Sequence, residues 1–310
     1  MNIYLAGDSI VQNYTEEEFI AGWGQFLPRF FKPDVNVFNY AKGGRSSRLF
    51  INEGRFEEID RHIQSGDYLF IEFCHNDDDS KDYKSMFNRQ TPLGVPDESG
   101  RFPVIAGVKM PKNYIPPEYI EALNNDDSIT DKQAVLNSVL AINQSYPYDT
   151  YYPYSKDASM GSYKWFIKQF IDMARKHDAS PVLVTAPAGT IMDAPGCHGG
   201  NNFSYIRAMR QIGEETGTPV LDLFSYSVEL FEKIGHDNIH RYTSIKKGIN
   251  KGKWPDDFLK ELAKPDTVSE NTHFNKDGAM LITEGLVELI LKSKNPQLCE
   301  LQSSLLHNVV

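Results

Sequence analysis

Short apolar runs alternate with longer stretches of helical periodicity along most of this chain, and this alternation restricts the folds open to it. The runs have the length and composition of buried strands: 2–6, 35–40, 68–73, 181–185 and 219–223. Apolar residues at helical spacing occupy 16–31, 55–64, 161–176, 203–216 and 276–293. Strands that alternate with helices form βαβ units, whose parallel sheet is covered on both faces. We therefore expect an α/β fold, a three-layer α/β/α sandwich on a five-stranded parallel sheet.

Two long segments interrupt the alternation, at about 78–154 and about 237–269. The first is rich in Pro, Asn and Asp and contains two short helical patterns, 117–123 and 132–142. Insertions of this length in a compact domain usually form lids, binding loops or additional packing. The sequence has no repeat, low-complexity tract or clear linker, so we expect one domain over residues 1–310.

Charge and composition exclude several classes of protein. The net charge of −10 argues against a nucleic-acid partner, because phosphate recognition needs a basic face. No run of about 18 apolar residues is present, which argues against a membrane span. Three cysteines without a C-x-x-C pair argue against a disulfide framework and a cysteine zinc site. No charged and apolar leader precedes the first strand, so we expect a cytoplasmic protein, or a secreted one whose leader was removed. The oligomeric state stays open.

Polar motifs follow the first three predicted strands. Gly7-Asp8-Ser9 comes directly after the first, where parallel sheets place their ligands. Gly43-Gly44 follows the second, where paired glycines let the backbone present an N–H group to a ligand. Taken singly, these motifs also fit a helix N-cap and a plain tight turn.

The third motif supplies a different kind of donor. Cys74-His75-Asn76-Asp77 follows the third strand, and the Asn76 amide is suited to hydrogen-bond a developing oxyanion. The alternative is an Asx-turn at the end of a strand.

A fourth motif precedes the last predicted helix. Glu270 stands three residues before His273, a spacing at which the acid can meet the imidazole on a loop or one helical turn and orient it. The alternatives are a capping or structural histidine, or metal ligands, although two residues are too few for a zinc site. If Ser9 is a nucleophile and His273 its base, their side chains must touch although they are 264 residues apart. A split into two domains would separate them and is therefore disfavoured.

The chain resembles the SGNH (GDSL-type) hydrolase superfamily, which has a flavodoxin-like fold, and within it the rhamnogalacturonan acetylesterases. Four blocks carry the resemblance in order along the chain: 4–9 (YLAGDS), 39–47 (NYAKGGRSS), 72–77 (EFCHND) and 271–279 (NTHFNKDGA). The similarity runs from residue 2 to about 290, apart from the two insertions.

The resemblance implies a catalytic role for each motif. Ser9 is the nucleophile and His273 the general base, with Glu270 as the acid that orients it. The backbone N–H groups of Ser9 and Gly44 and the side-chain amide of Asn76 form the oxyanion hole.

The resemblance also implies a substrate and its contacts. The substrate is an acetyl ester on a pectin-type polysaccharide or a related oligosaccharide, with Asp8, Arg45 and His75 as binding residues. No metal or cofactor is needed, and neither nucleic acid nor membrane is expected as a partner.

Three departures from the family pattern affect these expectations. The family usually has Asp where Glu270 stands, so Asp266, Asp277 or a Ser–His dyad are alternatives. The family's third block usually begins with Gly, where this chain has Cys74. The stretch 186–190 (APAGT) replaces an arginine pair found in relatives, so the substrate contacts are expected to differ.

Other functions remain possible on the same fold. A lipase-like or thioesterase member would keep the chemistry and change the acyl group, but the polar first insertion does not suggest a groove for long acyl chains. A non-catalytic glycan-binding module would keep the fold alone, because fold does not dictate function. A flavodoxin-like cofactor binder lacks support, since the chain has no Gly-rich phosphate loop.

Overall fold

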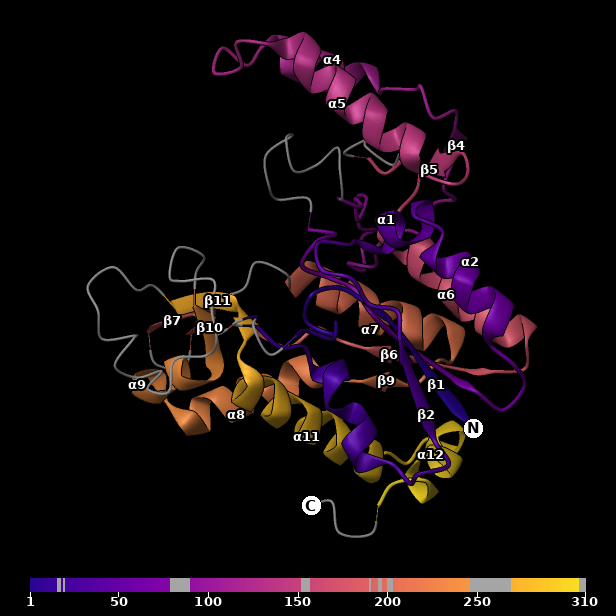
Figure 1. Cartoon of the computed structure of the whole chain (residues 1–310), viewed down its shortest axis with the longest axis vertical. Coiled ribbons are helices and arrows are strands. Elements are labelled where there is room, and N and C mark those ends of the chain that lie inside the picture. Colours follow the sequence, from indigo (N-terminus) through magenta and orange to yellow (C-terminus); the bar gives the residue numbers. More distant parts are fainter. Residues whose placement is uncertain are drawn as a thin grey trace.

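The computed structural model describes residues 1–15, 18, 20–78, 90–151, 157–189, 191–194, 197–199, 203–245 and 269–306. Five parallel strands form the central sheet, in the order β2-β1-β3-β6-β9 (Figure 1). Their bounds are β1 Asn2–Gly7, β2 Asn36–Asn39, β3 Tyr68–Glu72, β6 Ser180–Val184 and β9 Val220–Leu221. The predicted five-stranded parallel sheet is confirmed.

Both faces of the sheet are covered, because the alternate residues of its strands enter two separate apolar cores. Ile3 and Leu5 of β1 pack on one face, and Tyr4 and Ala6 pack on the other. Figure 1 shows α8 and α11 on the first face and α1, α2, α6 and α7 on the second. The bounds are α8 Leu223–Ile234, α11 Lys276–Lys292, α1 Ser47–Asn52, α2 Arg55–His62, α6 Tyr163–Lys176 and α7 Phe203–Thr216. The predicted three-layer sandwich is confirmed.

The helix predicted for 16–31 is wrong over the described residues. Two short 3-10 helices stand there, η1 (Trp23–Gln25) and η2 (Leu27–Phe30). The N–H of Ala21 bonds the carbonyl of Phe274 at 2.9 Å, and the N–H of Trp23 bonds that of Ile10 at 2.8 Å. The N–H groups of Ala21 and Trp23 therefore bond to residues outside the segment instead of to a helical turn, and Pro28 has no backbone N–H group. The apolar spacing reflects burial of the segment, not an α-helix.

Several short elements complete the fold without a clear signal in the sequence. An antiparallel ribbon of β10 and β11 faces the carboxyl ends of the sheet strands (Figure 1). The bounds of these elements are β10 Thr243–Ile245, β11 Ser269–Phe274, α9 His236–Ile239, η3 His240–Tyr242, β7 Ile191–Ala194, β8 Cys197–Gly199, η4 Pro296–Leu298 and α12 Cys299–Ser303. Much of the second predicted insertion, 246–268, lies outside the described residues.

The first insertion carries an apolar cluster of its own. The helices α4 (Pro117–Asn124) and α5 (Lys132–Ser145) confirm the two predicted helical patterns. They join around Tyr119, Leu123 and Val139. The short antiparallel pair of β4 (Lys109–Met110) and β5 (Thr150–Tyr151) connects them to the body. Figure 1 shows both helices beyond α1, at a distance from the sheet. The insertion therefore adds material without interrupting the sheet.

No helix among the described residues has both the length and the apolar character needed to cross a bilayer.

Replacement of Asn275 by Ala should destabilise the protein and affect the ribbon. The side chain caps α11 by accepting the N–H of Gly278 at 2.9 Å, and it donates to the carbonyl of Arg241 at 2.6 Å. Loss of an N-cap costs about 1 kcal/mol, and the second bond adds to that loss. Thermal unfolding should show a melting temperature several degrees lower for Asn275→Ala. An unchanged melting temperature would contradict the assigned cap.

Candidate active site

The predicted nucleophile lies in a tight turn at the end of β1. Gly7 closes the strand, where a Cβ would lie 2.6 Å from Cγ2 of Val11 and 3.0 Å from the carbonyl of Glu72. Asp8 then stabilises the turn, since its Oδ1 accepts the N–H of Ile10 at 2.9 Å. Ser9, 9% exposed, follows at the edge of the sheet. The backbone thus presents the Ser9 hydroxyl from a rigid position, and a larger residue at Gly7 would disturb it.

The predicted base meets the predicted nucleophile. Nε2 of His273, on β11, lies 2.8 Å from Oγ of Ser9. The main chain of 21–23 lies between the two elements, because Ala21 bonds Phe274 and Trp23 bonds Ile10. Each of these bonds joins the residue next to one member of the pair, so the segment holds β11 against the nucleophile turn. A serine hydroxyl this close to an imidazole nitrogen has the geometry for proton transfer.

Glu270, the acid expected to orient His273, lies on a strand and not on the predicted loop or helical turn. Glu270 and His273 both lie on the extended strand β11, not on a loop or a helical turn, so the spacing argument no longer applies. The side chain of Glu270 lies outside the described part of the structure. Of the two alternatives, Asp277 is exposed in the first turn of α11, and Asp266 lies outside the described residues.

The glycine loop after β2 is fixed by side chains on both sides. Gly44 has a φ of +80°, a left-handed conformation that favours glycine, and no described atom lies within 4 Å of the position of a Cβ. The N–H of Gly43 donates to Gln12, and the carbonyl of Gly43 accepts Nη1 of Arg45 at 2.8 Å. Nη2 of Arg45 also pairs with Glu53 at 2.7 Å. The loop is therefore held in place while its Gly44 side stays open.

The third predicted oxyanion donor lies beside the nucleophile turn. Asn76, 7% exposed, donates from Nδ2 to Oδ2 of Asp8 at 2.9 Å. An amide nitrogen has two hydrogens, so this bond uses one and orients the other. Asp8 is thereby bonded to both the turn that carries Ser9 and the amide expected to bind the oxyanion.

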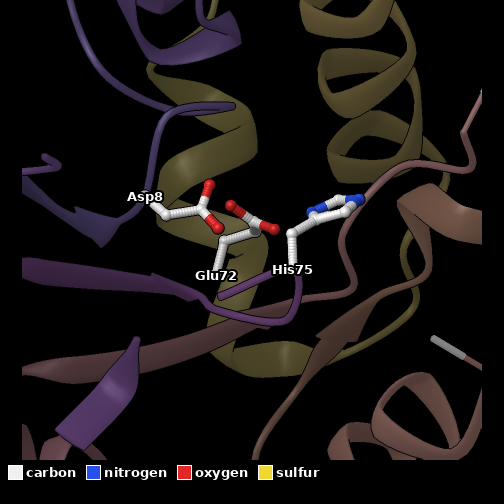
Figure 2. A group of neighbouring side chains, drawn as sticks. All are labelled: Asp8, Glu72 and His75. Atoms are coloured by element: carbon white, nitrogen blue, oxygen red, sulfur yellow. The ribbon is translucent and has the colours of Figure 1, made fainter. Parts of the chain in front are cut away.

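The three predicted substrate-binding residues have contrasting environments. Asp8 is fully buried, and its oxygens accept the bonds from Ile10 and Asn76. Arg45 is held by Glu53 and by the Gly43 carbonyl. His75 is half-buried beside Asp8 and Glu72 (Figure 2). A direct contact of any of them with substrate stays a prediction.

Two buried acids at this edge received no role of their own from the sequence, Glu72 and Asp77, both 0% exposed. Asp77 accepts hydrogen bonds from the backbone and hydroxyl of Ser47, the first residue of α1. Burial raises the pKa of Asp77 to about 7, although the bonds from Ser47 lower it. The signal available in the sequence was the presence of acids at the end of a wholly apolar strand, where burial is expected.

One described group of side chains has the spacing of a three-residue metal site. Asp8, Glu72 and His75 bring their potential ligand atoms within 4.8 Å of one another (Figure 2). Both oxygens of Asp8 already accept hydrogen bonds, which makes the group a poorer fit for a cation.

Known proteins are similar to this chain in sequence and in fold. Residues 3–96 match the model of the GDSL-like lipase/acylhydrolase family. This part of the chain is thus similar to GDSL-type acylhydrolases, and the class of enzyme indicated is that of the carboxylic ester hydrolases.

Individual relatives cover most of the chain. It is 28% identical to rhamnogalacturonan acetylesterase RhgT of Bacillus subtilis (strain 168), over 95% of this chain and 93% of the relative. It is 27% identical to the probable rhamnogalacturonan acetylesterase YesY of the same organism, over 93% of each chain. The crystal structure of B. subtilis protein YxiM aligns with a TM-score of 0.55 and 20% identity over 93% of this chain. This chain spans 55% of that structure, a likeness that supports the fold.

The raised pKa of Asp77 predicts a pH-dependent stability that Asp77→Asn should lack. The pKa of this carboxyl is about 7 in the folded protein and 3.8 ordinarily, so the folded state binds the proton more tightly than the unfolded chain. The contribution of Asp77 to stability is therefore full below about pH 4 and falls by about 1.4 kcal/mol per pH unit up to about pH 7.

Urea unfolding of the wild type and of Asp77→Asn between pH 4 and 8 measures this contribution. The unfolding free energy of the wild type should fall relative to that of the variant as the pH rises. Asp127→Asn, at an exposed position, should follow the wild type. Parallel pH curves for the wild type and Asp77→Asn would refute the shift.

Proposed function

We propose that this protein is a carbohydrate acetylesterase that removes acetyl groups from pectin-type polysaccharides of the rhamnogalacturonan kind, or from related polysaccharides and oligosaccharides. The observation that carries the proposal is the 2.8 Å contact between Oγ of Ser9 and Nε2 of His273. The names of the relatives RhgT and YesY support acetylated carbohydrate as the substrate class. The same contact supports the proposal that residues 1–310 act as one catalytic domain.

Acylation is the first half of the proposed reaction. The neutral imidazole of His273 takes the proton of the Ser9 hydroxyl at Nε2 while Oγ attacks the carbonyl carbon of the acetyl ester. The resulting tetrahedral intermediate carries a negative oxygen. When it collapses, the bond to the sugar oxygen breaks, and the imidazolium returns its proton to that oxygen. The products of this half are a free sugar hydroxyl and acetyl-Ser9.

Deacylation repeats these steps with water. His273 removes a proton from a water molecule, whose oxygen attacks the acetyl carbonyl of acetyl-Ser9. Collapse of the second intermediate returns the proton to Oγ of Ser9 and releases acetic acid, which ionises in solution. The reaction therefore consumes one water molecule for each ester and leaves the enzyme unchanged.

Stabilisation of the tetrahedral oxygen is assigned to three donors. They are the backbone N–H groups of Ser9 and Gly44 and the amide of Asn76. The open space beside Gly44 and the fixed orientation of Asn76 support this assignment. Donors held in place before reaction stabilise the developing charge without reorganisation, and a single one is worth about 3 kcal/mol.

Substitution of Ser9 or His273 by Ala should abolish acetate release. Each variant should lower kcat by about 10⁴-fold or more, because the nucleophile and its base act as one unit. Acetate release is measured on a panel of acetylated rhamnogalacturonan, other acetylated pectins and acetylated xylan. Ser138→Ala and His62→Ala, both at exposed positions, serve as matched controls and should keep wild-type rates. No release by the wild type from any carbohydrate, with activity on long-chain esters, would favour a lipase-like enzyme instead.

Substitution of Glu270 by Gln distinguishes a triad from a dyad. We propose that Glu270 orients His273 and stabilises its protonated form, so Glu270→Gln should lower kcat by about 10²-fold or more. Asp277→Asn should leave kcat unchanged, because Asp277 is exposed. The measurement is kcat for acetate release from the best substrate of the panel. A wild-type kcat for Glu270→Gln would instead indicate a Ser–His dyad.

A further inference from the structure

The buried carboxyl group of Glu72 has no role in the reaction described so far. Glu72 is the last residue of β3 and is fully buried. Neither of its carboxyl oxygens has a hydrogen-bond partner among the described residues. An ionised carboxylate in such a place loses its hydration without compensation, at a high cost in free energy. The carboxyl group of Glu72 must therefore either be protonated or have a positively charged neighbour.

The position of Glu72 brings its carboxyl group to that of Asp8. Strands β1 and β3 pair in parallel with Gly7 opposite Glu72, so Asp8 directly follows the residue beside Glu72. Figure 2 shows the carboxyl groups of Asp8 and Glu72 turned toward one another, with His75 on the far side of Glu72. Two buried carboxyls this close cannot both ionise readily, so one of them keeps its proton.

The charges around Glu72 indicate which carboxyl keeps the proton. Burial, followed by the charges of Asp8 and Asp77, raises the pKa of Glu72 well above its ordinary value. Asp8, by contrast, accepts two hydrogen bonds, from the N–H of Ile10 and the amide of Asn76, whereas Glu72 accepts none from the described residues. The neutral partner of the pair is therefore Glu72.

Asp8 is the residue through which Glu72 reaches the active site. Its two oxygens hold the nucleophile turn at Ile10 and the amide of Asn76, each at 2.9 Å. Rotation of the Asp8 carboxyl would move both at once. A side chain that limits this rotation, as Glu72 would, therefore keeps Ser9 and the Asn76 amide in their relative positions.

We propose that Glu72 is a positioning residue of this active site: as a neutral carboxylic acid beside Asp8, it occupies the buried space next to the Asp8 carboxylate without repelling it, and so preserves the orientation that aligns Asn76 for the oxyanion. The inference rests on the proposed function, since it concerns the same esterase site. An ionised residue at position 72 would repel Asp8, and a small apolar residue would leave it unrestrained.

The remaining titratable groups near Glu72 bear on its pH response. They are Cys74, His75 and Asp77 from the chain after β3, and Tyr163 from α6, whose hydroxyl donates to the carbonyl of Phe73. Burial raises the pKa values of the Cys74 thiol and the Tyr163 hydroxyl well above their ordinary values, so both stay neutral in ordinary buffers. Asp77 titrates at about 7, which any pH profile must separate from the effect of Glu72.

The test compares Glu72→Gln with Glu72→Ala, using a short-chain aryl acetate as substrate. Gln is neutral and nearly isosteric with the protonated acid, so Glu72→Gln should keep kcat within about threefold of the wild type. Glu72→Ala should lower kcat by about 10²-fold and change KM by less than about twofold, because the oxyanion donors act in the transition state.

A matched control separates positioning from general stability. Asp67 precedes β3 at its opposite end, is also buried, and accepts the N–H groups of Asn2 and Gln64. Asp67→Asn should lower the melting temperature and leave kcat unchanged. Equal losses of kcat in Glu72→Gln and Glu72→Ala, a wild-type kcat in Glu72→Ala, or a change in KM alone would overturn the proposal.

A second measurement does not depend on activity. Difference infrared spectroscopy of the wild type against Glu72→Gln at pH 6 should show a protonated-carboxyl band that belongs to the wild type alone. Absence of that band would overturn the proposal, even if Glu72→Ala fails to fold. Loss of wild-type activity on dialysis against EDTA, with recovery on adding Zn²⁺ or Mn²⁺, would also overturn it and indicate a bound cation. A wild type that shows the band but hydrolyses no ester would refute the proposed function and leave the protonated Glu72 standing.

Discussion

The contact between Ser9 and His273 depends on the main chain that lies between them. The two residues come from opposite ends of the sequence, and neither the sheet nor a single helix holds both. The segment 21–23 joins them, through the bonds of Ala21 to Phe274 and of Trp23 to Ile10. Trp23 is fully buried, and its carbonyl accepts the hydroxyl of Thr283 on α11. Main-chain bonds anchored in this core resist small shifts, which is how side chains distant in sequence reach catalytic distance.

The rest of the site follows from the parallel sheet. The carboxyl ends of parallel strands lie at one edge of the sheet, so the topology alone brings the loops after β1, β2 and β3 together. What the sheet does not provide is the orientation of each donor, and side chains supply it. Gln12 and Arg45 hydrogen-bond the glycine loop, and Asp8 hydrogen-bonds Asn76. The acids Glu72 and Asp77 are buried at the same edge. The edge combines a rigid scaffold with an unusual density of buried carboxyl groups.

The sequence predicted the sheet because it depends on local patterns, and the structure brings Ser9 and His273 together as expected, while their catalytic roles stay a prediction. Largely apolar runs such as 68–73 identify strands buried on both faces, and the polar motifs that follow them indicate the edge where the candidate site lies. The segment 16–31 was mistaken for a helix because burial of Trp23 and its neighbours imitates helical spacing. The extended setting of His273 was missed because its pairing partner, β10, is a three-residue strand without an apolar run. The role of Glu72 depends on contacts across strands, which no local pattern contains.

His273, the proposed base, lies on a ribbon that does not belong to the five-stranded sheet. A two-stranded ribbon has few bonds of its own, and regions of this kind open at lower free energy than the core to which they attach. The ribbon and the sheet with its helices are then separate cooperative units, and the activity depends on the ribbon. Mild denaturant, or a weakened bond at Ala21, would silence the enzyme while its sheet and helices remain intact, and removal of the stress would restore activity without a complete refolding.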